Sequence, residues 1–296
     1  MQVRIAYHST IDCARPISEL CYDQRGVTDR DSDPAIYLRG LNAFLTSYAR
    51  QRTQSCTFPT GKKAFMHDST RNLDATALQS LSGFFISARP GVDQVLLNIN
   101  PANSAFFHRN NLQTLINGMR GNASMRQVSG ILKGVIVQIN NKLQVGTNQP
   151  PPDIARRFVV DIGLTIDRQM CVQQQQMTVR TWYSQAPYGH DLAPVNPNLY
   201  TNNRSILAVC VAKDSRANSP TREYIPADAL TVCGFQRFGG FLGTAQLQKM
   251  IQFARLDPGD NASRIMSHGL PLFGFDDPQQ RGLVSCKWLL LADVTN

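Results

Sequence analysis

The stretch GFFISARPGVDQVLLNINPANSAFF, residues 83–107, decides the fold of this chain. Phe84 and Ile86 alternate with smaller or polar neighbours, and Pro90-Gly91 then interrupts the pattern. The alternation of apolar and other residues resumes over residues 95–99. Period-two alternation on both sides of a Pro-Gly break predicts a hairpin of two strands, each with one buried face. We expect the other elements to be arranged around this hairpin.

The composition indicates a folded, basic protein. The chain has 296 residues, of which 42% are hydrophobic and 17% charged, which supports real cores and argues against a disordered tail. Lys and Arg number 30 against 21 Asp and Glu, so the formal net charge is +9. A basic excess of this size permits a polyanionic partner without requiring one.

Cysteine and histidine usage argues against a secreted or metal-binding protein. The seven cysteines include no CxxC pair, and the five histidines show no metal-ligand spacing. The first residues lack a secretory pattern, and no apolar run is long enough to span a bilayer. We therefore expect a cytoplasmic protein with no cofactor and no membrane partner.

Helical spacing marks several segments. Asp33-Pro34 combines an N-cap residue with a proline at the first helical position, which predicts that a helix begins there. Residues 112–121 repeat apolar side chains at helical spacing and end at a glycine. Thr244 is expected to cap another helix, with Leu247 and Ile251 facing inward.

Alternating apolar residues predict short strands over 132–139, 158–162 and 205–213. In the second of these, Phe158, Val160 and Ile162 are expected to form the buried face. Several short strands with a helical insert predict an α+β fold that contains a small OB-like β-barrel. Barrels of this kind bind single-stranded ends of nucleic acids.

Two groups of residues resemble a known family. The glycine, aromatic pair, Ser87, Arg89-Pro90, Leu-Asn-Ile-Asn and Ala105-Phe106-Phe107 resemble the first linker of eukaryotic, fungal-type Argonaute proteins. The Thr-Val-x-x-aromatic-aromatic run from Thr178, the Tyr224-Ile225-Pro226 step and Gln236-Arg237 resemble a PAZ domain in their order.

This resemblance implies a division into four segments. Residues 1–82 are expected to be part of an Argonaute N domain, residues 83–134 the first linker, and residues 135–275 a PAZ-like barrel with an αβ insert. Residues 276–296 do not resemble the family's second linker and are expected to form a divergent tail. We expect the chain to be a fragment of such a protein that lacks the family's middle and PIWI domains.

The resemblance also implies a function in RNA silencing and a set of binding residues. A PAZ domain holds the single-stranded 3′ end of a small guide RNA, or of a duplex with a 3′ overhang, by aromatic stacking and by donors to phosphates. Proteins of a silencing complex are further expected partners. The family's pocket positions fall on the following residues: Arg156, Arg157, Phe158, Trp182, Tyr188, Arg222 and Tyr224.

The sequence departs from the family's pocket at two positions, and these departures keep alternatives open. Asn141 stands where the family has a histidine, and Phe158 lacks the hydroxyl of a tyrosine. One alternative is an interaction or decoy protein with a degenerate pocket that does not bind RNA. Another is an inactive fragment of a slicer nuclease. We expect no enzymatic activity, because the carboxylate-metal site of a PIWI domain is missing from the sequence.

Overall fold

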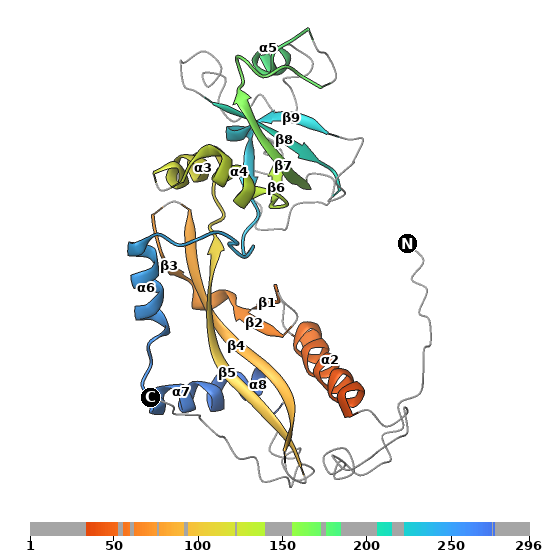
Figure 1. The fold of residues 1–296 in the computed structure, drawn as a ribbon, viewed down its shortest axis with the longest axis vertical. Helices are drawn as coiled ribbons and strands as arrows, with labels where there is room; N and C mark the ends of the chain where they lie inside the picture. The colour runs from red at the N-terminus through yellow and green to blue at the C-terminus, as the bar shows by residue number, and fades with distance from the viewer. Residues whose placement is uncertain are drawn as a thin grey trace. The chain divides into compact units, whose positions relative to one another are not determined.

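A computed structural model describes residues 34–52, 56–59, 62–75, 77–91, 94–121, 123–139, 156–172, 176–184, 206–214, 222–273 and 275. The chain forms two compact units (Figure 1). Unit 1 contains residues 1–69, 82–103 and 253–296, and unit 2 contains residues 70–81 and 104–252. Both units are therefore built from segments that are far apart in the sequence. The four segments expected from the sequence stay a prediction.

The described elements follow one another in this order: α2 (Pro34–Arg52), β1 (Cys56–Thr57), β2 (Lys63–Met66), η2 (His67–Ser69), β3 (Arg71–Asn72), β4 (Leu78–Gly91), β5 (Gln94–Phe107), α3 (Leu112–Arg120), α4 (Met125–Leu132), β6 (Ile136–Ile139), β7 (Arg156–Thr165), α5 (Val179–Ser184), β8 (Leu207–Ala212), β9 (Glu223–Pro226), η7 (Ala227–Ala229), β10 (Leu230–Val232), α6 (Thr244–Ala254), α7 (Pro258–Arg264), η8 (Ile265–Gly269) and α8 (Leu270–Leu272). No helix in these ranges is long and apolar enough to cross a membrane.

The expected pairing of two strands around residues 83–107 is confirmed: β4 and β5 pair with each other. Both are longer than the pattern indicated, and β4 continues through Pro90 to Gly91. Each of the two strands contributes one part to each unit. In unit 1, β2 pairs with β4 in antiparallel fashion, with Ala64 opposite Phe84, and β1 pairs with β2.

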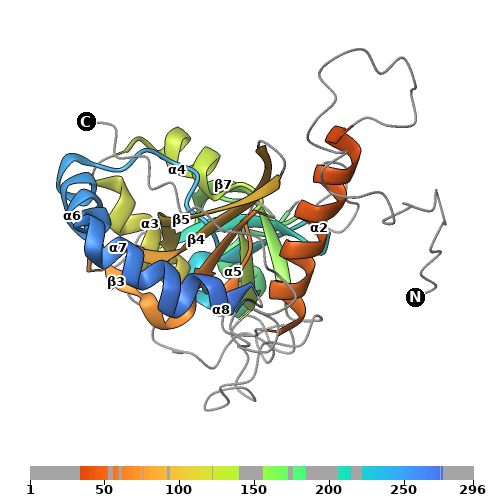
Figure 2. The ribbon, with the colours of Figure 1, turned by 90° about the horizontal axis from the view of Figure 1, so that it is seen from below.

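The core of unit 1 lies on the face of β4 and β5 that the alternation predicted. Phe84, Ile86 and Ile99 are buried there, together with Leu45 of α2 and Phe273 near the end of α8. Helices α7 and α8 lie beside these strands and run across the strand direction in both ribbon views (Figures 1 and 2). Burial of large apolar side chains from strand and helix on one face is what stabilises this layer.

Unit 2 contains an antiparallel sheet with the strand order β10-β6-β7-β8-β9. All six residues of β8, the fourth strand in this order, are buried. The mixed helix-and-strand fold agrees with the α+β expectation. In the described part of the chain, however, β10 and β9 are the edges of the sheet, and these strands do not close into a barrel.

Two strand predictions in unit 2 were wrong in detail. Leu132, expected to begin a strand, ends helix α4, and the strand begins at Ile136. On β7 the buried residue is Val159, whereas Phe158 and Val160 are half-buried. The pairing of β7 with β8 shifts register between Val159 and Asp161. Such a bulge moves side chains to the opposite face and breaks strict alternation.

Helix α6 forms where Thr244 predicted it, but it does not bury its apolar face. Leu247 is 48% exposed and Ile251 57% exposed, and no residue of α6 is buried. The helix is held by polar contacts within unit 2. Gln246 donates to the Asp74 carboxylate at 2.6 Å, and Lys249 Nζ donates to the Leu73 carbonyl at 3.1 Å.

Candidate functional site

A cavity of about 850 Å³ opens in unit 2 between helix α4 and strands β7, β8 and β9. Its floor is formed by neighbouring strands in register. Asp161 on β7 pairs with Cys210 on β8, and Cys210 pairs with Tyr224 on β9. Residues paired across a sheet project from the same face, and all three line the cavity. The floor therefore carries a carboxylate at one end and a phenol ring at the other.

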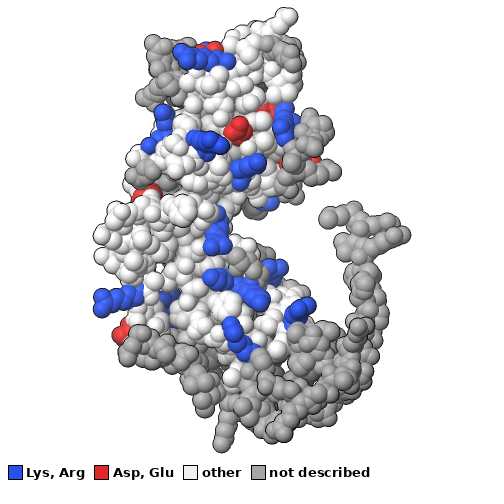
Figure 3. All heavy atoms as spheres, in the orientation of Figure 1, with Lys and Arg blue, Asp and Glu red and all other residues white. Residues whose placement is uncertain are grey.

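The walls of the cavity are cationic. Four exposed basic residues line it: Arg126, Lys133, Arg168 and Arg222. Arg126 lies in helix α4 and Lys133 follows its last residue, while Arg168 and Arg222 lie beside the ends of β7 and β9. Lys and Arg also predominate over Asp and Glu on the described surface drawn in Figure 3. Such a wall attracts an anion with several charges, and arginine forks bind phosphate oxygens with defined geometry.

Tyr224 is half-buried in the floor, close to the charged residues of the cavity. Burial raises the pKa of the Tyr224 hydroxyl; Cys210 and the Asp161 carboxylate raise it further, and Arg222 lowers it. Burial likewise raises the pKa of the Cys210 thiol. Tyr224 is therefore a neutral hydroxyl-bearing ring at neutral pH, and Cys210 is a protonated thiol.

Helix α4 connects one wall to the floor. The Ser129 hydroxyl donates to Asp161 Oδ1 at 2.5 Å, and the backbone N–H of Ile162 donates to the same oxygen at 2.8 Å. The helix begins with a capping box, in which the Ser124 and Gln127 side chains bond each other's backbone N–H. Capping fixes the start of a short helix and so fixes the side chains on its first turns.

The structure brings two of the seven predicted site residues together in this cavity, Arg222 and Tyr224. Arg156, Arg157 and Phe158 lie at the start of β7 and do not line it. Arg157 is engaged elsewhere: its Nε lies 3.1 Å from Glu223 Oε1, and the pair is mostly buried. The charge of Arg157 is thus largely offset by its neighbour.

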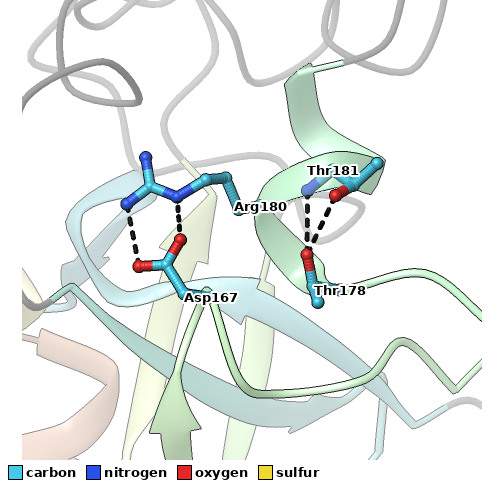
Figure 4. Close-up of polar contacts among 4 residues, drawn as sticks. All are labelled: Asp167, Thr178, Arg180 and Thr181. Atoms are coloured by element: carbon cyan, nitrogen blue, oxygen red, sulfur yellow. Dashed lines mark hydrogen bonds and ion pairs between the residues drawn. The ribbon is translucent and has the colours of Figure 1, made fainter.

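Trp182 lies on α5, half-buried and outside the cavity lining, and the adjacent Tyr183 is buried. Figure 4 shows how α5 is docked: the Arg180 guanidinium binds both oxygens of the Asp167 carboxylate. This hydrogen bond holds the pKa of Asp167 below its ordinary value. The Thr178 hydroxyl accepts from the Thr181 N–H at 3.3 Å and caps the helix.

Two of the positions singled out from the sequence, Tyr188 and Asn141, lie outside the described residues. The sequence analysis missed the contribution of α4, namely Arg126, Ser129 and Lys133. The Ser124–Gln127 spacing is a capping-box signature that predicts a helix start at this point. Within the described ranges, no grouping of three or more His, Cys, Asp or Glu side chains could hold a metal ion.

Comparison with known proteins gives one family match. Residues 60–108 match the model of the Argonaute linker 1 domain. A search of curated proteins finds no match.

The solved structures that resemble this chain include three proteins of low sequence identity. They are Kluyveromyces polysporus Argonaute with a guide RNA (13% identity, TM-score 0.44, 79% of this chain and 27% of that one), Drosophila Piwi (12%, 0.36, 85% and 28%) and the Argonaute protein from Methanocaldcoccus janaschii in complex with guide DNA (9%, 0.25, 79% and 28%). The chain spans little more than a quarter of the length of each. At these scores the similarity identifies no residue of this chain as functional.

Proposed function

We propose that the chain is part of an Argonaute-type protein and acts in a small-RNA pathway. In this proposal unit 2 holds the single-stranded 3′ end of a small guide RNA. The match of residues 60–108 to an Argonaute linker supports the family assignment. The proposal further places the protein in the cytoplasm, in contact with other proteins of a silencing complex, and treats residues 135–275 as a PAZ-like domain.

One observation carries the binding function: Arg222 and Tyr224 line the same cavity. Both belong to the pocket positions that the resemblance implied, and the proposal assigns Arg222 as a phosphate donor and Tyr224 as a stacking residue. An aromatic ring beside cationic side chains is the combination that holds single-stranded RNA, since the bases stack and the phosphates meet positive charge. The three further basic residues of the walls add to the attraction for phosphate.

The experiment is a fluorescence anisotropy titration of the whole chain with two RNA duplexes of the same sequence. One duplex carries a two-nucleotide 3′ overhang and the other is blunt. The proposal expects tighter binding of the overhang, independent of base identity, because stacking tolerates every base. Equal binding of both duplexes would contradict recognition of a 3′ end and would indicate only nonspecific attraction between a basic surface and a polyanion.

Variants locate the binding in the cavity. Tyr224→Ala is expected to weaken overhang binding about tenfold or more, because a lost stacking contact costs about 1–3 kcal/mol and 1.4 kcal/mol is a factor of ten. Arg222→Ala is expected to weaken binding and to reduce the salt dependence by about one phosphate contact. Arg120→Ala removes the same charge from an exposed position of α3 outside the cavity and is the control. Each variant must first show the thermal unfolding of the unmodified chain.

The remaining predicted residues test how far the RNA extends from the cavity. Trp182→Ala is expected to weaken overhang binding if the strand continues onto α5, and Arg156→Ala and Phe158→Ala are expected to do so if it reaches the start of β7. Loss of affinity in Tyr224→Ala alone, with these three variants unchanged, would confine the site to the cavity.

A further inference from the structure

Asp161 is the single acidic residue among the described residues that line the basic cavity. A carboxylate there repels phosphate and weakens the attraction that the four basic residues provide. Its position is nevertheless fixed from two sides. The Ser129 hydroxyl reaches it from α4 at 2.5 Å, and the Ile162 N–H reaches it from its own strand at 2.8 Å. Attraction of an anion therefore does not explain why an exposed carboxylate is held at this place in the cavity.

Both of these hydrogen bonds end on Oδ1 of Asp161. No described residue donates to Oδ2, and the side chain is exposed to the cavity. An ionised carboxylate accepts hydrogen bonds and cannot donate them. The group that fits Oδ2 is therefore a neutral donor on an otherwise anionic ligand. In a nucleic acid strand the sugar hydroxyl is such a donor, and the 2′-hydroxyl is what distinguishes RNA from DNA.

We propose that Asp161 makes the cavity selective for RNA over DNA by accepting a hydrogen bond from a ribose 2′-hydroxyl, with Ser129 as its positioning residue. This inference rests on the proposed function, because it concerns the same site. Asp161 and Tyr224 flank Cys210 on neighbouring strands, and the Tyr224 ring reaches across to β7, where a Cβ at Gly163 would lie 2.9 Å from Tyr224 Cε1. A base stacked on this ring places its sugar beside β7, where the 2′-hydroxyl meets the Asp161 carboxylate.

The test compares two duplexes that differ only in the overhang, which consists of two ribonucleotides in one and two deoxyribonucleotides in the other. The whole chain is expected to bind the ribose overhang about tenfold more tightly, as a hydrogen bond to a charged acceptor is worth about one decade or more. The measured quantity is the ratio of the two dissociation constants, which cancels general losses of affinity.

Asp161→Asn tests the Oδ2 acceptor while it keeps the hydrogen bonds that hold the side chain in place. Asparagine keeps Oδ1 for Ser129 and Ile162 but replaces the acceptor Oδ2 with an amide donor. The ratio is expected to fall to about one. The affinity for the deoxyribose overhang is expected to rise, because a negative charge has been removed from among the four cations. A merely structural role of Asp161 would lower both affinities together and leave the ratio unchanged.

Ser129→Ala tests the positioning role. The ratio is expected to fall several-fold, and Ser129→Thr, which restores the hydroxyl, is expected to recover it. Arg126→Ala is the matched control from the same helix: it removes a cation of the wall, lowers both affinities and leaves the ratio as it was.

Two failures are distinguishable. Overhang binding that exceeds blunt binding but shows no sugar preference, or a preference that survives in Asp161→Asn, contradicts the role of Asp161 and leaves the proposed function standing. Equal binding of overhang and blunt duplexes contradicts both.

Discussion

Gly163 lies directly against the ring of Tyr224 in the cavity floor: a Cβ at position 163 would come within 2.9 Å of Tyr224 Cε1. The same Cβ would lie 2.6 Å from Gln169 Oε1 and 3.1 Å from the Ala208 carbonyl oxygen. Gln169 Oε1 accepts from the Leu164 N–H at 3.1 Å, so its position is also fixed. Tyr224 and Gln169 can therefore occupy their positions only because residue 163 has no side chain.

The first prediction is that Gly163→Ala displaces Tyr224. We expect the free energy of unfolding to fall by about 1–3 kcal/mol, the usual cost of adding atoms to a filled site. Overhang RNA is expected to bind at least several-fold more weakly, because the stacking ring is displaced. Urea unfolding and anisotropy titration measure the two effects.

The control for this variant is Gly130→Ala, in α4 and in the same cavity lining. A Cβ there would meet nothing within 4 Å. Alanine is expected to stabilise the helix by up to about 1 kcal/mol, since glycine is the weaker helix former. Gly163→Ala with the stability and affinity of the unmodified chain would mean that Tyr224 is not held where the structure has it.

The second prediction concerns the Asp167–Arg180 pair that docks α5. At pH 7, Asp167→Asn is expected to lower the free energy of unfolding by about 0.2–1 kcal/mol, because half of the carboxylate's surface is exposed and solvent screens the pair. The loss of stability stays small because a second contact holds α5 in place: the backbone N–H of Arg180 donates to the Ile166 carbonyl at 3.0 Å.

The pH dependence of this pair has a definite sign. The Arg180 hydrogen bond lowers the pKa of Asp167 in the folded state. The stability that the Asp167–Arg180 pair adds to the folded state is therefore fully present above the ordinary carboxyl pKa of about 3.9. It is lost as the pH falls through the lowered pKa of Asp167. The difference between Asp167→Asn and the unmodified chain should be constant from pH 6 to 8 and shrink in acid. A double-mutant cycle with Arg180→Gln isolates the pair, and a coupling energy of zero would contradict it.

The third prediction concerns catalysis. Incubated with Mg²⁺ or Mn²⁺ and a guide RNA, the purified chain is expected to bind a complementary target and leave it uncut. Phosphodiester cleavage by the two-metal route needs clustered carboxylates, and the described residues hold no such cluster. Gel analysis of labelled target provides the measurement. Guide-directed cleavage that survives repeated purification would overturn the expectation.

The helices that the sequence predicts best are those whose apolar residues repeat without interruption. Leu112, Leu115, Ile116 and Met119 of α3 are all buried, as their spacing indicated. Helix α4 has only two buried residues, Val128 and Leu132, and glycine and serine lie between them. Its hydrophobic repeat is too short to distinguish a helix from a strand. The capping-box residues Ser124 and Gln127 are therefore the better sequence signal for this helix.

The cavity was only partly predictable for a related reason. Arg222 directly precedes β9 and Tyr224 lies in it, so the two could be interpreted together from the sequence. Asp161 reaches the cavity because a bulge shifts β7 by one position relative to β8. A register shift depends on the pairing of two strands that are distant in the sequence, and single-sequence alternation does not contain it.

The fourth prediction returns to the stretch with which the fold begins. A Cβ on Gly83 would come within 1.9 Å of the Ala64 carbonyl oxygen and 2.7 Å of the Phe65 Cα. Both are backbone atoms of β2, which pairs with β4 at this point. Because neither is the end of a flexible side chain, the strands have to separate to admit a methyl group.

Gly83→Ala is therefore expected to cost about 3 kcal/mol or more, at the upper end of overpacking effects. Hydrogen exchange should localise the damage: protection of the Ala64 and Phe65 amides falls, while the β8 amides of unit 2 keep theirs. Gly239→Ala, where a Cβ would meet nothing within 4 Å, is the control and should leave thermal unfolding nearly unchanged. An unchanged melting temperature for Gly83→Ala would mean that β2 does not pair with β4 at this glycine, and the sheet of unit 1 would need a different register.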